Sequence, residues 1–333
     1  MMSKTKQTKA RKLTQDELKK EIRRLAQKKN AVIMAHYYVD GVVQDIADFI
    51  GDSLALAQQA AKTEADIIVL CGVHFMGETA AILCPEKKVL VPDPAATCSL
   101  AESCPADAFA EFVQAHPDHI VVSYVNTTAA TKAVTDVVVT SSNARQIVES
   151  LPADAKIIFG PDQNLGSYIN ALTGREMLLW NGACHVHARF SVEKIIELKA
   201  KYPEAKVLVH PECKGPVVKL ADKVGSTAAL LKFAIEDEAT EFIVATESGI
   251  LHEMQKKAPQ KTFIPAPPED TFDETGARTC ACNECEYMKM VTLEKVYRCL
   301  KEEQPVVTVE PEIAVRAIKP IEKMLDISAQ LGL

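Results

Sequence analysis

Cysteine is the residue type in this chain most able to do chemistry, and its placement is uneven. The chain has 333 residues and 10 cysteines. Cys280, Cys282 and Cys285 form one short run, while Cys98 and Cys184 stand alone far upstream. In an intracellular protein, such a set favours metal binding or catalysis over disulfides. We expect Cys98, Cys184 and Cys285 to meet in space and to hold an iron–sulfur cluster.

Three cysteines are one fewer than the usual ligand set of a [4Fe–4S] cluster. One iron would then keep an open position, where it could act as a Lewis acid and help a hydroxyl to leave. This predicts dehydration or condensation chemistry rather than electron transfer. The competing hypothesis is a structural zinc on Cys280, Cys282 and Cys285 with His252 as the fourth ligand, although no second C-x-x-C pair completes it.

Composition narrows the class of protein. Apolar residues make up 47% of the chain and charged residues 25%, which is typical of a globular protein. The net charge of −7 disfavours a nucleic-acid binder with a broad basic surface. No apolar run is long enough to cross a membrane, and no export signal follows the basic start. We expect a cytoplasmic protein whose residues 1–13 form a disordered basic arm.

A repeat of nearly constant period organises the elements that must position these cysteines. Short apolar runs alternate with helical stretches, as in parallel βα units. The runs at 32–36, 120–124 and 206–210 end 88 and 86 residues apart. Gly72, Gly160 and Thr246 each follow an apolar run and show the same offsets. The chain thus reads as three related units, beyond the even strand spacing of any α/β protein.

The predicted fold is α/β, with three αβα sandwich domains related by a pseudo-threefold axis around a central cluster. Each domain has a small four-stranded parallel sheet. We expect the domains at 14–100, with the C-terminal helix packing on it, at 101–187 and at 188–275. Residues 276–333 would supply the cysteine-bearing loop and the C-terminal helices.

The cysteines follow this period in part. Cys98 and Cys184 are 86 residues apart. A third equivalent would fall near residue 270, where there is no cysteine. An insertion of about one loop length brings in Cys285 instead.

Polar residues stand where the predicted strands end. They are His36 and Tyr38 in the first unit, Tyr124 and Asn126 in the second, and His210 and Glu212 in the third. In open α/β sheets, ligands bind outside the carboxyl ends of the strands. Any one of these residues alone is better explained as a satisfied polar group at a strand end. Their repetition predicts that the three sets line one central cavity.

Hydroxyl residues precede the predicted helices that follow these strands. Ser53, Ser141, Ser226 and Thr227 are suited to capping helix starts. The same positions favour phosphate or carboxylate groups of a ligand, because free N–H groups and the helix dipole point there. The two roles are compatible, and together they indicate a small substrate with several negative charges.

Helical patterns close both ends of the chain. Thr14 and Glu17 form a capping box that predicts a helix start. Helices are also expected over residues 288–302 and 312–331. Neither a G-x-G-x-x-G nor a P-loop pattern is present, so we expect no nucleotide site.

The chain resembles the quinolinate synthase family, and the matching motifs run in family order from about Leu18 to the C-terminus. The motifs are Met34-Ala35-His36-Tyr37-Tyr38, Gly51-Asp52-Ser53-Leu54, Phe75-Met76-Gly77-Glu78-Thr79-Ala80, Cys98-Ser99-Leu100, Tyr124-Val125-Asn126-Thr127, Val139-Thr140-Ser141-Ser142, Gly182-Ala183-Cys184, Val209-His210-Pro211-Glu212 and Val224-Gly225-Ser226-Thr227. Some members carry a C-x-x-C-x-x-C run that ends at this last ligand, and this chain keeps Cys282 and Cys285 of it. This chain has Thr279 at the first of those positions, with Cys280 one residue away.

The resemblance implies a reaction, a cofactor and a set of site residues. The family condenses iminosuccinate with dihydroxyacetone phosphate to quinolinate, losing phosphate and two waters, in NAD biosynthesis. It implies a [4Fe–4S] cluster on Cys98, Cys184 and Cys285, with Cys285 chosen because Glu286-Tyr287-Met288-Lys289-Met290 follows it. L-Aspartate oxidase is the expected functional partner, and another open-iron hydro-lyase is the runner-up activity. The residues that the resemblance implies as substrate contacts are His36, Ser53, Tyr124, Asn126, Ser141, His210, Glu212 and Thr227. Ser226 is added because it stands at a helix start. Glu212, His210 and Tyr38 would transfer protons.

Overall fold

The computed structural model describes residues 13–270 and 283–333. The first part of the chain forms α1 (Gln15–Lys28), β1 (Ala31–His36), α2 (Gly41–Gln44), β2 (Phe49–Gly51), α3 (Ser53–Lys62), β3 (Ile67–Cys71), α4 (His74–Leu83) and β4 (Lys88–Leu90). The second forms α5 (Ser99–Glu102), α6 (Ala106–Gln114), β5 (His119–Tyr124), α7 (Ala129–Lys132), β6 (Val137–Val139), α8 (Ala144–Ser150), β7 (Lys156–Gly160), α9 (Gln163–Thr173) and β8 (Leu178–Leu179). The third forms a 3₁₀ turn (His187–Arg189), α10 (Val192–Lys201), β9 (Lys206–Val209), α11 (Gly215–Val218), β10 (Lys223–Val224), α12 (Thr227–Glu236), β11 (Glu241–Ala245), α13 (Ile250–Lys257) and β12 (Thr262–Pro265).

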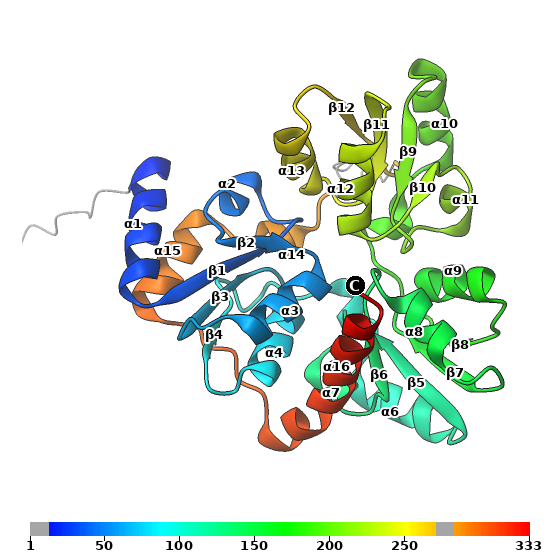
Figure 1. Ribbon diagram of the computed structural model, residues 1–333, viewed down its shortest axis with the longest axis horizontal. Coiled ribbons are helices and arrows are strands. Elements are labelled where there is room, and N and C mark those ends of the chain that lie inside the picture. Colours follow the sequence, from blue (N-terminus) through cyan, green and yellow to red (C-terminus); the bar gives the residue numbers. More distant parts are fainter. Residues whose placement is uncertain (1–12, 271–282) are drawn as a thin grey trace, which may run out of the picture.

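Three four-stranded sheets follow from these elements, and all three have the same topology. Their strand orders are β2-β1-β3-β4, β6-β5-β7-β8 and β10-β9-β11-β12. All the neighbouring strands pair in parallel. The prediction of three α/β units with small parallel sheets is confirmed. Figure 1 shows the three units grouped around a common centre.

The shared strand order fixes where each unit can bind a ligand. The first strand of each unit lies inside its sheet, with the second strand on one side and the third on the other. The order therefore reverses beside the first strand, which opens a crevice at its carboxyl end. His36 and Tyr124 end β1 and β5, and His210 directly follows β9. The three crevices present the polar residues that the sequence places at strand ends.

Burial explains why these short strands form. Every residue of β3 and β6 is buried, as expected for strands covered by helices on both faces. The first helix begins as predicted, since Thr14 and Glu17 form a reciprocal capping box. The predicted helix at 288–302 is instead two helices, α14 (Glu286–Lys289) and α15 (Leu293–Glu302). The break arises because Thr292 caps α15, accepting a hydrogen bond from the N–H of Lys295.

The C-terminal helices return to the first two units. Helix α15 packs against α1 and β3, and the N–H of Val307 donates to the carbonyl of Val89 in β4. Helix α16 (Pro311–Gln330) agrees with the predicted 312–331 helix and packs mainly against α7 and β6, with further contacts to α4. The last helix thus lies over the second unit as well as the first (Figure 1).

Two predictions fall partly or wholly outside the described residues. The basic arm at 1–13 does so up to residue 12, and so do Cys280 and Cys282 of the zinc hypothesis. Among the described residues, no helix combines the length and apolar character that crossing a bilayer requires.

Candidate active site

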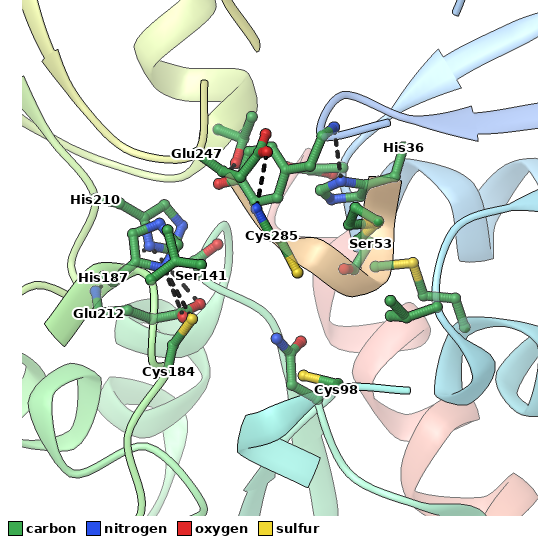
Figure 2. A pocket seen from close by; sticks show the side chains of 18 of the residues that line it. His36, Ser53, Cys98, Ser141, Cys184, His187, His210, Glu212, Glu247 and Cys285 are labelled. Carbon is green, nitrogen blue, oxygen red and sulfur yellow. Dashed lines mark hydrogen bonds and ion pairs between the residues drawn. The ribbon is translucent and has the colours of Figure 1, made fainter. Parts of the chain in front are cut away.

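Three cysteines line a single central pocket. Each comes from a different unit or from the segment that follows it. Cys98 precedes α5, Cys184 lies in the loop after β8, and Cys285 precedes α14. All three are free thiols and line a pocket whose space between atoms, including the part open to solvent, is about 580 Å³. Figure 2 shows their sulfur atoms around this pocket. The structure therefore brings together the three cysteines that the sequence singles out.

The surroundings of the three sulfurs suit a positively charged metal centre. Burial raises the pKa of Cys98 to about 12 and that of Cys285 to about 11, and it raises the pKa of Cys184 well above its usual value. Charge on a neighbouring cysteine sulfur raises the pKa of Cys98 and that of Cys184 further. Backbone N–H groups donate towards all three sulfurs, as is common at iron–sulfur sites. Thiolates here need a cationic partner.

The spacing of the sulfurs favours a cluster over a single ion. Across the described residues, the one group of donors close enough to share an ion is Cys184, His187 and Glu212. Cys98 and Cys285 are not part of that group, although they line the same pocket. A body larger than one ion is needed to bridge the three thiolates. The donor set therefore fits an iron–sulfur cluster.

The residues that follow the cysteines hold the three cysteine segments to one another. The hydroxyl of Ser99 lies 2.5 Å from Nδ1 of His185. The His185 ring meets the Tyr287 ring edge-on, with 6.0 Å between centroids. The Tyr287 hydroxyl donates to Glu102 in α5 at 3.4 Å. Contacts outside the pocket thus fix the relative positions of all three thiols.

Close packing also positions the Cys184 loop. The N–H of Cys184 donates to Oδ2 of Asp162 at 3.2 Å, and the carbonyl of Gly182 accepts from the N–H of Gln163. A Cβ at Gly182 would lie 2.5 Å from the carbonyl oxygen of Pro161. Because that neighbour is backbone, the loop can accept a side chain only by moving.

We expect Gly182→Ala to destabilise the protein and to lower its metal content. The backbone clash should cost about 1–3 kcal/mol and shift Cys184 away from the pocket. Thermal unfolding and iron content after anaerobic reconstitution measure the two effects. Gly215→Ala is the matched control, because a Cβ there meets nothing within 4 Å. Equal iron content in the two variants would contradict this account of the Cys184 loop.

A buried carboxylate stands at the meeting point of the second and third units. The Tyr124 hydroxyl donates to Oε1 of Glu212 at 2.6 Å. Nδ1 of His187 lies 3.1 Å from Oε2 of Glu212, and Nδ1 of His210 lies 3.7 Å from Oε1. Burial raises the pKa of Glu212, but the nearby His187 and the hydrogen bonds from His187 and Tyr124 outweigh it and lower this pKa overall. Glu212 is thus ionised at neutral pH and accepts hydrogen bonds from its neighbours.

A chain of hydrogen bonds connects this carboxylate with Tyr38 of the first unit. Nε2 of His187 lies 2.9 Å from Oγ1 of Thr246. Oγ1 of Thr246 lies 2.7 Å from the Tyr38 hydroxyl, which lies 2.6 Å from Oγ1 of Thr227. Each of these groups can both donate and accept. A proton can therefore pass between Glu212 and Tyr38 without leaving the buried site.

The two strand-end histidines are neutral groups. Burial lowers the pKa of His36 to about 3, against a smaller opposing effect of Glu212. Burial, helped by the neighbouring His187, lowers the pKa of His210 to about 3 as well. At neutral pH both imidazoles can therefore donate and accept hydrogen bonds, but they carry no positive charge.

Asn126 offers an unused hydrogen-bonding atom to the pocket. Its Oδ1 is buried and has no partner among the described residues. Lys132, which is fully buried, donates to the carbonyls of Val125 and Thr127 on either side of Asn126. Burial lowers the pKa of this lysine to about 8. The lysine therefore fixes the backbone that aims the Asn126 side chain.

The structure places nearly all of the predicted site residues at one pocket. Those that line it are His36, Tyr38, Ser53, Cys98, Tyr124, Asn126, Ser141, Cys184, His210, Glu212, Thr227 and Cys285. Ser226 is not in the lining; it caps α12, accepting from the N–H of Ala229. Capping elsewhere differs from expectation. Asp52 rather than Ser53 caps α3, since its carboxylate accepts from Ala55, and Asn143 rather than Ser141 occupies the N-cap position of α8.

Sequence reasoning missed His187, Thr246 and Glu247 as part of this site. His187 stands three residues after Cys184, and that cysteine–histidine spacing is the signal that could have found it. Thr246 occupies the place that Gly72 and Gly160 hold in the other units, so a polar residue there was informative. Glu247 accepts from the N–H of Cys285 at 3.1 Å and from Lys289 at 3.0 Å, and it thereby joins the third unit to the last cysteine.

Comparisons with known proteins agree on one family. A family model described as quinolinate synthetase A protein matches residues 20–326. A quinolinate synthase of a Synechococcus species is 53% identical over 92% of this chain and 93% of its own length. Those of Thermosynechococcus vestitus and Chloroherpeton thalassium are 54% and 52% identical, over 92% and 95% of this chain and 94% and 96% of their own.

The chain also aligns with solved structures. One of them is the E-1-hydroxy-2-methyl-but-2-enyl-4-diphosphate reductase of Plasmodium falciparum, at 12% identity and a TM-score of 0.31, over 86% of this chain and 93% of that one. A likeness this low supports no inference about fold or function.

Proposed function

Because the chain belongs to the quinolinate synthetase A family, we propose that its central pocket condenses iminosuccinate with dihydroxyacetone phosphate. The activity itself follows from the family: quinolinate synthesis, a transferase step of NAD biosynthesis. The two substrates together balance one quinolinate, one phosphate and two waters. What is proposed is the identity of the substrates, the cofactor and the role of each residue.

We propose that Cys98, Cys184 and Cys285 hold a [4Fe–4S] cluster. The convergence of three partly buried thiols on one pocket, spaced too widely for a single ion, is the observation that carries this proposal. When bound, a cluster with three cysteine ligands supplies an iron with an open position, a Lewis acid for a substrate oxygen.

The pocket would hold anionic substrates without formal positive side chains. No lysine or arginine is among its described lining residues. Ser53 and Thr227 stand at the starts of α3 and α12, where backbone N–H groups and the helix dipole favour carboxylate or phosphate. His36, Ser141 and the free Oδ1 of Asn126 add hydrogen bonds that orient the substrate.

Glu212 is the proposed base for the proton transfers of isomerisation and dehydration. It takes a proton at Oε2 and passes it to Nδ1 of His187, 3.1 Å away. His187 then releases a proton from Nε2 to Thr246, and the Thr246 hydroxyl passes one to Tyr38. As Tyr38 receives this proton, it gives its own hydroxyl proton to the substrate, while His210 stands beside the carboxylate at 3.7 Å.

Thr246→Val is expected to slow turnover with little effect on KM. Valine keeps the shape but breaks the hydrogen-bond chain between His187 and Tyr38. The lost contact corresponds to about 1–3 kcal/mol, or roughly 5–150-fold in kcat. The measurement is kcat, KM and the pH profile of the reconstituted enzyme. Thr246→Ser restores the hydroxyl and should rescue kcat, and failure of this rescue would make Thr246 a packing residue only.

The direct test uses full-length protein purified without oxygen. We expect about four irons and four acid-labile sulfides per chain and quinolinate from the two substrates together. A cluster without quinolinate, but with dehydration of a single small acid, would favour the hydro-lyase. Zinc without sulfide would leave a zinc-stabilised binding protein.

Three broader expectations stay predictions. We propose domain limits at 14–100, 101–187 and 188–275, with 276–333 as the closing segment. We propose that an L-aspartate oxidase supplies iminosuccinate, because this imine hydrolyses and must be made close to its use. We also propose a cytoplasmic location, where the other steps of such a pathway would meet this enzyme.

A further inference from the structure

Cys184, His187 and Glu212 form a second metal-binding arrangement inside the pocket, different from the three-cysteine set. One donor atom of each lies within 4.8 Å of the others, and His187 and Glu212 are almost fully buried. Nδ1 of His187 is 3.3 Å from Sγ of Cys184 and 3.1 Å from Oε2 of Glu212. Figure 2 shows the three side chains converging on one point.

These separations match a tetrahedral zinc ion closely. With usual Zn–S, Zn–N and Zn–O bond lengths, tetrahedral geometry sets the N···S separation at about 3.6 Å and the N···O separation at about 3.4 Å. The observed distances are 3.3 and 3.1 Å, so a few tenths of an ångström of movement would admit the ion. One thiolate, one imidazole and one carboxylate leave the fourth position open to the pocket.

Outer partners orient two of the three donors. Oγ1 of Thr246 lies 2.9 Å from Nε2 of His187 and can accept its proton, which leaves the lone pair of Nδ1 free for a metal. The Tyr124 hydroxyl donates to Oε1 of Glu212, so Oε2 is the oxygen that faces His187. Such outer-shell hydrogen bonds are typical of histidine–metal sites.

We propose that cluster-free protein binds one zinc ion through Cys184, His187 and Glu212, and that zinc and the cluster exclude each other. Binding releases one proton, from the Cys184 thiol, and moves the imidazole proton of His187 to Nε2. The zinc site does not depend on the proposed reaction. Only the exclusion rests on the proposed cluster, because both metal centres use the Cys184 sulfur.

Cobalt is the probe for the ligand set, because a tetrahedral Co²⁺–thiolate site absorbs visible light. Full-length protein is stripped of iron without oxygen, in a Cys280→Ser/Cys282→Ser background that removes the two cysteines outside the described residues. We expect one Co²⁺ per chain, displaced by one Zn²⁺. His187→Asn and Glu212→Gln should each weaken Co²⁺ binding at least 10-fold. Loss of an outer partner alone costs roughly 10–100-fold in affinity, and these residues are ligands.

Matched variants separate this site from the three-cysteine set. Cys98→Ser and Cys285→Ser should bind Co²⁺ as the background does, and so should His210→Asn, whose ring stacks on His187 at 4.5 Å between centroids. Loss of binding in Cys98→Ser and Cys285→Ser, or full binding in His187→Asn, would overturn the proposal. Zinc should also raise the Tm of the background protein but not of His187→Asn, which guards against a folding defect.

The exclusion is tested by reconstitution. Protein loaded with one equivalent of Zn²⁺ is given Fe²⁺ and sulfide, and labile sulfide and the visible spectrum are measured. We expect several-fold less cluster than in protein without zinc, and normal assembly when a chelator removes the zinc first. Full cluster assembly with the zinc still bound would refute the exclusion while leaving the zinc site to stand on the cobalt result.

Discussion

Serine in place of any one of Cys98, Cys184 and Cys285 is expected to abolish the cluster and quinolinate formation together. Each thiol belongs to a different part of the chain, and the described structure offers no other cysteine in the pocket lining. Loss of an outer partner of a metal site costs roughly 10–100-fold in affinity, and loss of a ligand should cost more. Iron, labile sulfide and quinolinate are measured on anaerobic protein.

Cys299→Ala is the control for these variants. Cys299 is buried in α15, away from the pocket, and should keep full iron content and activity. The prediction concerns all three positions. If the cluster survives in the Cys98→Ser or Cys184→Ser protein, the ligand set does not draw on all three units. If metal is lost only in Cys285→Ser, the zinc hypothesis for the last cysteine run is favoured instead.

Glu212→Gln should leave the cluster intact and reduce kcat by about 10²–10⁴-fold. The amide keeps the size of the side chain, but it cannot accept a proton as the carboxylate does. Its NH₂ group must also face either the Tyr124 hydroxyl or His187, where the carboxylate accepts hydrogen bonds at 2.6 and 3.1 Å. Iron and sulfide should match the wild type while single-turnover product formation fails.

Glu253→Gln is the matched control for this carboxylate. Glu253 is nearly as buried as Glu212 and belongs to α13 in the same unit, but it pairs with Lys256 and Lys257 outside the pocket. Its kcat should stay near wild type. Near wild-type kcat in Glu212→Gln itself would remove that residue from the proton path, and loss of iron would make its role structural.

The sequence predicts the three α/β units because their strands and helices depend on local, periodic patterns of apolar residues. Apolar runs ending at His36, Tyr124 and His210 mark the first strand of each unit. These three strands hold the same position in their sheets, so their carboxyl ends lie at corresponding edges. The polar residues at those ends therefore meet once the units pack together. The same reasoning located Cys98 and Cys184 directly and Cys285 only by allowing for an insertion.

Side-chain direction across units is what the sequence could not supply. His187 reaches Thr246, 59 residues away, through a contact that no periodicity encodes. Serine is a common helix cap, so the sequence predicts Ser53 as the cap of α3, yet the carboxylate of Asp52, one residue earlier, accepts the capping hydrogen bond. Which of two neighbouring side chains accepts the capping hydrogen bond depends on their exact positions within one turn, and residue types alone do not decide it.

The C-terminal position of Cys285 has a consequence for synthesis on the ribosome. Domains generally fold as they emerge, at about 5–20 residues per second, so Cys98 precedes Cys285 by on the order of 10–40 s. The helices that cover the first two units, α15 and α16, emerge later still. Cys184, His187 and Glu212 are all made before Cys285. The nascent chain would thus contain all three residues of the proposed zinc site before it contains the third proposed cluster ligand.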